Sequence, residues 1–193
     1  MEKKLTIDVE ALKKSLLQRR PMKARFKLPM SEDEAYAYLL AAMMAEVEYR
    51  HRRFNKNPEL ENQIAKAARW LTKQDRFGIL LCGVPGNGKT TLMLAIRSLI
   101  NYLDMKDAYN ESMTVFRIDA REIARLNKDD FAKFEKIRSK KMLAIDDMGL
   151  EPAEVMDYGN ILNPVVDLLS YRYDEQLFTI VTTNLKPEEI RQK

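Results

Sequence analysis

The chain has 193 residues, of which 46% are hydrophobic and 32% charged, and it carries a formal net charge of +4. This length suffices for one full hydrophobic core with a small appendage, and the single cysteine excludes an internal disulfide framework. No apolar run reaches the roughly 18 residues of a membrane-spanning helix, and the N-terminus lacks the apolar stretch of a signal peptide. We therefore expect a globular protein of the cytoplasm with no membrane segment.

The first 30 residues are strongly basic, with nine Lys or Arg side chains and three acidic ones, so their net charge is 9 − 3 = +6. A basic segment of this kind either contacts nucleic-acid phosphates or an acidic protein surface, or it is simply solvated. Apolar residues recur there at helical spacing, which predicts a short amphipathic helix able to dock on a partner. These residues are Val9, Leu12, Leu16 and Leu17.

Two further helices are predicted before residue 75. Ser31-Glu32-Asp33-Glu34 has the capping-box pattern that starts a helix. That helix ends in Arg50-His51-Arg52-Arg53, cations that either stabilise the helix C-terminus or contact DNA. Pro58 opens the next helix, and its apolar stripe, which includes Trp70, predicts packing against the rest of the chain.

The most restrictive pattern is Gly83-Val84-Pro85-Gly86-Asn87-Gly88-Lys89-Thr90, which matches the phosphate-binding sequence G-x-x-x-x-G-K-[ST]. A buried strand, residues 77–82, precedes it, and an apolar helix follows from Lys89. The glycines allow consecutive backbone N–H groups to face the phosphates at the positive end of the helix. We predict a nucleotide site, with Lys89 on the β- and γ-phosphates and the Thr90 hydroxyl on Mg²⁺. The predicted nucleotide contacts are Gly83, Pro85, Gly86, Asn87, Gly88, Lys89, Thr90 and Thr91.

The strand before this loop contains Cys82, which we expect to be a small buried apolar residue. Residues 113–119 predict a strand of alternating exposure, and helical residues follow to about residue 137. The apolar strand of residues 141–147 ends in two carboxylates and resembles a Walker B strand. We assign Asp146 to Mg²⁺, through water, and Asp147 to the attacking water.

Residues 160–176 predict the last crossover helix, with Pro164 in its first turn. The β-branched run of residues 177–184 predicts a further core strand, which ends at Asn184. Parallel strands bind ligands at their carboxyl ends, so Asn184 either faces the γ-phosphate or attacking water, or satisfies its own turn. The alternation of strands and helices predicts an open parallel α/β sheet covered by helices.

These motifs resemble those of the AAA+ ATPases, and within them the helicase-loader and transposition-helper group of DnaC/IstB-like proteins. The resemblance covers roughly residues 60–190. It rests on the phosphate-binding loop, on Leu143-Ala144-Ile145-Asp146-Asp147-Met148-Gly149, and on Tyr171-Arg172-Tyr173 followed by Ile180-Val181-Thr182-Thr183-Asn184-Leu185. It implies a P-loop NTPase fold of the AAA+ type, in which Asn184 is the sensor-1 residue.

The chain departs from the family pattern in two respects. Many members have Glu where this chain has Asp147, whose carboxylate is one methylene shorter. The arginine finger and the helical lid of the family lie beyond Lys193, so we assign neither and expect a core without its lid, from either a fragment or a naturally reduced protein. Arg172 precedes the sensor strand, outside the usual finger position, which predicts a structural or surface role.

The resemblance implies an ATPase that uses Mg²⁺ and acts as a nucleotide switch in DNA replication or transposition, with weak turnover in this chain alone. Lys89, Asp147 and Asn184 would be its catalytic residues. We expect residues 1–57 to form a basic helical segment for partner or DNA contact and residues 58–193 to form the ATPase core.

The implied partners are a replicative helicase or a transposase, and single-stranded DNA is a further candidate. A homo-oligomer and a monomer both stay open. Two other functions also stay open: an ATP-binding adaptor with negligible hydrolysis, which would follow from a missing arginine finger, and a small-molecule P-loop kinase, which usually needs an Arg-rich lid.

Overall fold

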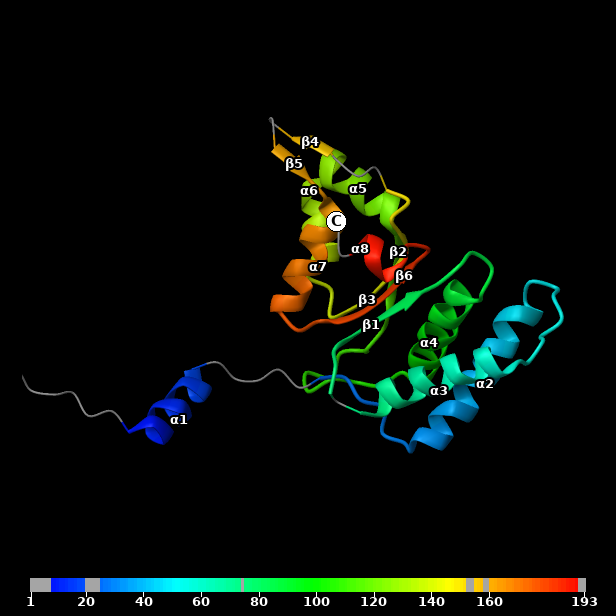
Figure 1. Cartoon of the computed structure of the whole chain (residues 1–193). Coiled ribbons are helices and arrows are strands. Elements are labelled where there is room, and N and C mark those ends of the chain that lie inside the picture. The colour runs from blue at the N-terminus through cyan, green and yellow to red at the C-terminus, as the bar shows by residue number, and fades with distance from the viewer. Residues whose placement is uncertain (1–7, 20–24, 74, 152–154, 158–159, 191–193) are drawn as a thin grey trace, which may run out of the picture.

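The computed structural model describes residues 8–19, 25–73, 75–151, 155–157 and 160–190 (Figure 1). The helices are α1 (Val9–Arg19), α2 (Glu32–Glu48), α3 (Pro58–Thr72), α4 (Lys89–Leu103), α5 (Ala120–Asp129), α6 (Phe131–Arg138), α7 (Pro164–Asp174) and α8 (Pro187–Ile190). The strands are β1 (Gly78–Cys82), β2 (Phe116–Asp119), β3 (Met142–Met148), β4 (Val155–Asp157), β5 (Asn160–Leu162) and β6 (Phe178–Thr183). Among these helices, none is long and apolar enough to cross a membrane.

Four strands form a parallel sheet in the order β1-β6-β3-β2. The last of them in sequence, β6, therefore lies between β1 and β3. Helical crossovers connect the strands, as parallel pairing requires. The predicted open parallel α/β sheet is confirmed, and the carboxyl ends of all four strands meet at one edge, where Cys82 pairs with Thr183 and Asp119 pairs with Asp146.

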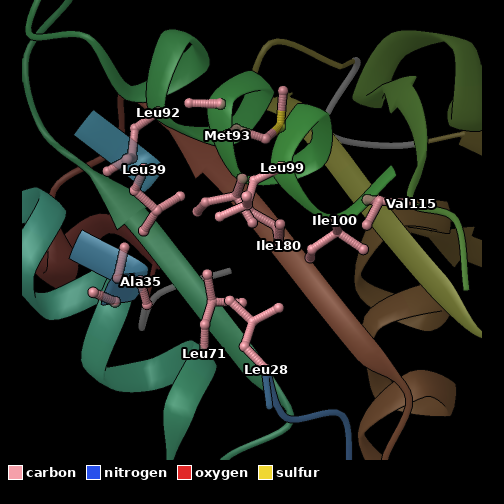
Figure 2. Close-up of a cluster of buried hydrophobic side chains, with 14 of the residues drawn as sticks. Leu28, Ala35, Leu39, Leu71, Leu92, Met93, Leu99, Ile100, Val115 and Ile180 are labelled. Carbon is pink, nitrogen blue, oxygen red and sulfur yellow. The ribbon is translucent and has the colours of Figure 1, made fainter. Parts of the chain in front are cut away.

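Helices cover both faces of this sheet (Figure 1). On one face, α4 packs against β6 and α2, and α2 packs against α3. Figure 2 shows Leu99 and Ile100 of α4 beside Ile180 of β6. On the other face, α5, α6 and α7 pack on a second buried apolar cluster that includes Val181. Almost every residue of β3 and β6 is buried. This fits the arrangement, because a parallel strand that helices cover on both faces has no side in contact with solvent.

The predicted capping box and the two predicted first-turn prolines are confirmed. Ser31 Oγ accepts a hydrogen bond of 3.2 Å from the Glu34 N–H, and Glu34 Oε2 accepts one of 2.8 Å from the Ser31 N–H, so the capping box is complete. Pro58 and Pro164 each stand in the first turn of a helix, where proline costs no hydrogen bond. Trp70 packs against Phe178 with ring centroids 4.9 Å apart.

The predicted N-terminal helix is α1, which lies apart from the other helices in Figure 1. Its four apolar residues are exposed by 45% to 73% of their surface. The predicted helix is thus present and its apolar residues are exposed, whereas its docking on a partner stays a prediction.

The predicted helical stretch from residue 120 to about residue 137 is confirmed as two helices, α5 and α6. They meet at Asp130, whose carboxylate accepts from the Lys133 N–H and so begins α6. Two expectations were wrong in detail. Residues 160–162 form β5, paired antiparallel with β4, and the last crossover helix starts at Pro164. Cys82 is exposed, because β1 is an edge strand of the described sheet and was not the buried strand we expected. The boundary at residue 57 between the N-terminal segment and the ATPase core stays a prediction.

Candidate nucleotide-binding site

The loop between β1 and α4 has a backbone that only glycine adopts readily. Gly88 caps α4 in the left-handed region, with φ 86°. Gly83 has φ 148°, and a Cβ there would lie 2.2 Å from the Asn87 side-chain nitrogen. The glycines of the phosphate-binding motif are thus required by the loop itself, which runs directly into the positive end of α4.

Lys89 lies folded back onto this loop. Its Nζ donates hydrogen bonds to the carbonyls of Gly83 (2.7 Å) and Val84 (2.8 Å) and to Asn87 Oδ1 (3.1 Å), and only 8% of its surface is exposed. Burial lowers the pKa of this ammonium, and the Asp147 carboxylate opposes that shift. The three acceptors of Lys89 Nζ are all neutral oxygens. Negatively charged phosphate oxygens bind an ammonium group more strongly than neutral oxygens do, so they could replace these acceptors.

Asp146 of β3 is the centre of the polar contacts at the sheet edge. Its carboxylate is 2% exposed, and Oδ1 accepts hydrogen bonds from the hydroxyls of Thr90 (2.9 Å) and Thr182 (2.7 Å). The structure thus brings together the two residues predicted to hold Mg²⁺. A hydroxyl and a carboxylate are hard oxygen donors of the kind that Mg²⁺ prefers, so this donor set fits the metal. The metal-binding roles themselves stay predictions.

Asp147 follows at an irregular point of β3, where the register with β6 shifts between Ile145 and Met148. Its backbone is left-handed, with φ 56°, and its N–H donates to Thr182 Oγ1 at 2.9 Å. A bulge of this kind re-aims a side chain relative to the strand. It accounts for the half-buried Asp147 standing beside the fully buried Asp146.

Burial raises the pKa of Asp147 above its ordinary value, and the neighbouring carboxylate of Asp146 raises it further. Lys89 opposes this rise. A carboxylate with a raised pKa is a stronger base than an ordinary aspartate, which suits the predicted work on a water molecule.

Asn184 stands one residue beyond β6 and is partly exposed. The turn that contains it is fixed by Thr183, whose hydroxyl donates to the Met148 carbonyl (2.6 Å) and accepts from the Leu185 N–H (3.1 Å). Because Thr183 pairs with both Cys82 and Met148, Asn184 follows at the same sheet edge as the phosphate-binding loop and the two carboxylates.

Sequence reasoning missed two residues that contact Asp146. Thr182 links Asp146 to the backbone of Asp147, and Arg117 of β2 places Nη2 2.5 Å from Asp146 Oδ2. The Thr182-Thr183-Asn184 run at the end of β6 could have indicated that Thr182 belongs to the site. Nothing in the local sequence around Arg117 indicates its contact, because it depends on how β2 pairs with β3.

A cavity of about 280 Å³ opens beside the loop. Gly86, Asn87, Gly88 and Thr91 line it from the loop side. The end of α2 and the residues after it form the opposite wall, which includes Met43, Val47, Arg50, Arg52, Arg53 and Phe54. Four predicted nucleotide contacts therefore border a cavity whose lining is mixed, with apolar, amide and charged side chains that include Glu59 as well as the arginines.

Arg172 takes no part in this site. It is 1% exposed, and its guanidinium donates to the Thr179 hydroxyl (2.9 Å) and to the carbonyls of Arg138 (2.8 Å), Lys140 (2.7 Å) and Phe178 (2.6 Å). Burial lowers its pKa to about 10. Of the two predicted roles, structural or surface, the structural one is correct.

We compared the chain with known proteins. No family model and no curated protein matches it. Among solved structures, DnaI matches with a TM-score of 0.52 and 21% identity, over 90% of this chain and 85% of that one. The chain thus shares with DnaI an α/β fold in which helices cover a parallel sheet. The fold likeness to DnaI agrees with the resemblance of the motifs to DnaC/IstB-like helicase loaders.

AMPPCP-bound DnaA from Aquifex aeolicus also matches, with a TM-score of 0.49 and 17% identity. The match covers 72% of this chain, and it spans about two-fifths (42%) of the DnaA chain.

Proposed function

We propose that this chain binds ATP with Mg²⁺, hydrolyses it, and acts as a nucleotide switch of the helicase-loader kind. The observation that carries the proposal is the contact between Thr90 and Asp146, which joins the phosphate-binding loop to the end of β3. A loop of glycines, a helix N-terminus, a buried lysine and a hydroxyl–carboxylate pair form one continuous site for a metal-bound polyphosphate.

In this proposal Mg²⁺ would supply charge stabilisation for the phosphates when bound. The Thr90 hydroxyl and Asp146 would hold it. Lys89 would exchange the loop carbonyls for the β- and γ-phosphate oxygens, as its fold-back onto the loop supports. Backbone N–H groups of the loop would orient the phosphates, and the cavity beside Thr91 would take the rest of the nucleotide.

Asp147 would accept the proton of the attacking water, and Asn184 would position that water. Two observations support these roles. The raised pKa of Asp147 strengthens it as a base, and the turn fixed by Thr183 keeps Asn184 at the same sheet edge. Because Asp147 is shorter than the glutamate of many relatives, we expect slow turnover.

We further propose that residues 1–57 contact the partner, a replicative helicase or a transposase, and that single-stranded DNA is a second ligand. The basic N-terminal residues and the exposed apolar side of α1 support this. Nucleotide binding would be transmitted to this segment through α2, which borders the cavity beside the loop.

The experiment is a direct ATP-binding titration combined with ATP turnover at rising protein concentration, with and without single-stranded DNA. We expect Lys89→Ala to abolish nucleotide binding, and Asp147→Asn to bind ATP normally without turnover. Turnover per subunit that rises with concentration means that subunits complete each other's sites. Tight binding with negligible turnover supports the adaptor instead, and normal ATP binding by Lys89→Ala would refute the site.

A further inference from the structure

The buried carboxylate of Asp146 is paired with a cation that comes from the solvent side. Arg117 of β2 is 43% exposed along its side chain, whereas Asp146 is 2% exposed. Arg117 stands opposite Ala144 in the register of β2 with β3, and its Nη2 reaches Asp146 Oδ2 at 2.5 Å. This ion pair therefore links a half-exposed side chain of β2 to the buried carboxylate at the centre of the candidate site.

The two oxygens of Asp146 are used differently. Oδ1 accepts from the hydroxyls of Thr90 and Thr182, and Oδ2 accepts from Arg117. The hydroxyl of Thr90 gives its hydrogen to Asp146, so its oxygen keeps lone pairs for a metal. The Oδ1 contacts are thus compatible with a bound cation, whereas the guanidinium occupies Oδ2 and repels a divalent ion.

We propose that Arg117 is an internal counter-ion of the nucleotide-free site, which competes with Mg²⁺ for Oδ2 of Asp146 and moves away when the metal and nucleotide bind. This inference rests on the proposed function. Its physical basis is that a buried carboxylate without a compensating charge is costly, so some cation must accompany Asp146 in either state. Arg117 can leave when Mg²⁺ takes over the compensation of Asp146, because its guanidinium is already partly in water.

Arg121 offers a matched control. It lies at the same edge of the sheet, where its Nη2 is 2.9 Å from Asp119 Oδ2, and its side chain is 61% exposed. Arg121 thus pairs with the carboxylate of Asp119, next to the site, rather than with Asp146. Arg121→Gln removes the same charge from the same region without freeing Oδ2 of Asp146.

The experiment measures binding of a fluorescent ATP analogue while Mg²⁺ is titrated, and compares the Mg²⁺ concentrations at half-maximal binding. We expect Arg117→Gln to lower this midpoint about three- to tenfold, because a charge-assisted hydrogen bond no longer opposes the metal. Arg117→Lys, which keeps a cation at this position, should stay near the wild type. Arg121→Gln should shift the midpoint less than about twofold, as expected for a screened neighbouring charge.

A second measurement needs no nucleotide. In thermal melting, Mg²⁺ alone should raise the Tm of Arg117→Gln more than that of the wild type or of Arg121→Gln, because ligand binding to the folded state stabilises it. This readout separates competition for the metal from a purely structural role, which would lower the Tm of Arg117→Gln without any response to Mg²⁺.

The outcomes separate the inference from the proposed function. A wild type that binds no ATP analogue at any Mg²⁺ concentration refutes the proposed function, and the inference falls with it. Normal binding with equal midpoints for Arg117→Gln and Arg121→Gln overturns the inference alone. A higher midpoint for Arg117→Gln also overturns it, and would mean that Arg117 binds the phosphates directly.

Discussion

The hydroxyl of Thr90 donates a hydrogen bond of 2.9 Å to Oδ1 of Asp146, although 56 residues separate the two in sequence. This contact ties the N-terminus of α4 to the end of β3. Thr182 of β6 donates to the same oxygen, so three elements meet on one atom. A site built in this way responds as a unit when any one of its members is changed.

Thr182→Val tests this connection. Valine has the shape of threonine but cannot donate to Asp146 or accept from the Asp147 N–H, which leaves a buried donor without its partner. We expect a loss of about 1–3 kcal/mol in unfolding free energy and a larger loss in ATP turnover than in ATP affinity. Urea denaturation and steady-state kinetics measure the two effects. Thr114→Val, at an exposed position before β2, is the control, and equal behaviour of the two variants would contradict the prediction.

Gly149→Ala tests how the end of β3 positions the turn after β6. Gly149 has φ 100°, and a Cβ there would lie 2.7 Å from the side chain of Leu185, the residue after Asn184. We expect turnover to fall about tenfold or more while ATP binding changes little, because the turn that holds Asn184 must shift. The double variant Gly149→Ala/Leu185→Ala removes the contact and should recover part of the turnover. Full turnover by the single variant would refute the role of this turn.

Arg172→Met tests the buried guanidinium. The substitution removes the donor for three backbone carbonyls and the Thr179 hydroxyl around the start of β3 and β6. We expect a loss of about 2–4 kcal/mol in unfolding free energy, since buried acceptors lose a charged donor. Arg125→Met, which breaks an exposed pair on α5, should cost less than about 1 kcal/mol. Denaturant unfolding measures the free energy of unfolding of both variants. Equal losses would show that the buried hydrogen bonds of Arg172 stabilise the fold no more than an exposed ion pair does.

The ion pair between Lys141 and Asp107 predicts a dependence of stability on pH. The hydrogen bond from Lys141 lowers the pKa of Asp107 below its ordinary value of 3.8. A carboxylate whose pKa is lowered by folding stabilises the folded state above its ordinary pKa, and this contribution disappears as the pH falls through the lowered value.

Lys141→Met should therefore lower the Tm at neutral pH, and its difference from the wild type should shrink below pH 3.8. Differential scanning calorimetry over this pH range measures the difference. Lys66→Met, at an exposed position of α3, is the control and should show no such trend. If the difference in Tm between Lys141→Met and the wild type stayed constant below pH 3.8, the predicted role of the Lys141–Asp107 ion pair would be contradicted.

The elements of this fold were largely predictable because their signals are local. The capping box at Ser31, the prolines at helix starts and the apolar runs of the strands each depend on neighbouring residues. The start of α7 shows the limit of such signals: Ile161 and Leu162 continue the apolar pattern of the helix in sequence, yet both belong to β5. Apolar periodicity alone does not separate a short strand from a helix extension.

The site was predictable where a motif carries its chemistry and not where pairing between strands creates it. Lys89, Thr90 and Asp146 come together as the motifs predict. The contact of Arg117 with Asp146 depends on the register of β2 with β3, which no local pattern specifies. The exposure of Cys82 likewise follows from the edge position of β1, a property of strand order.

The central place of β6 also has a consequence for synthesis on the ribosome. Gly78 pairs with Thr179, a separation of 179 − 78 = 101 residues, so β1 cannot pair within this sheet until β6 has emerged. Contacts between such distant segments form slowly because a long loop must first close. The loop of residues 83–88 is thus made early, but Asp146 and Asp147 gain their contacts with Thr182 only after β6 has joined the sheet. The proposed nucleotide site should therefore be completed late, once β6 has paired with β1 and β3.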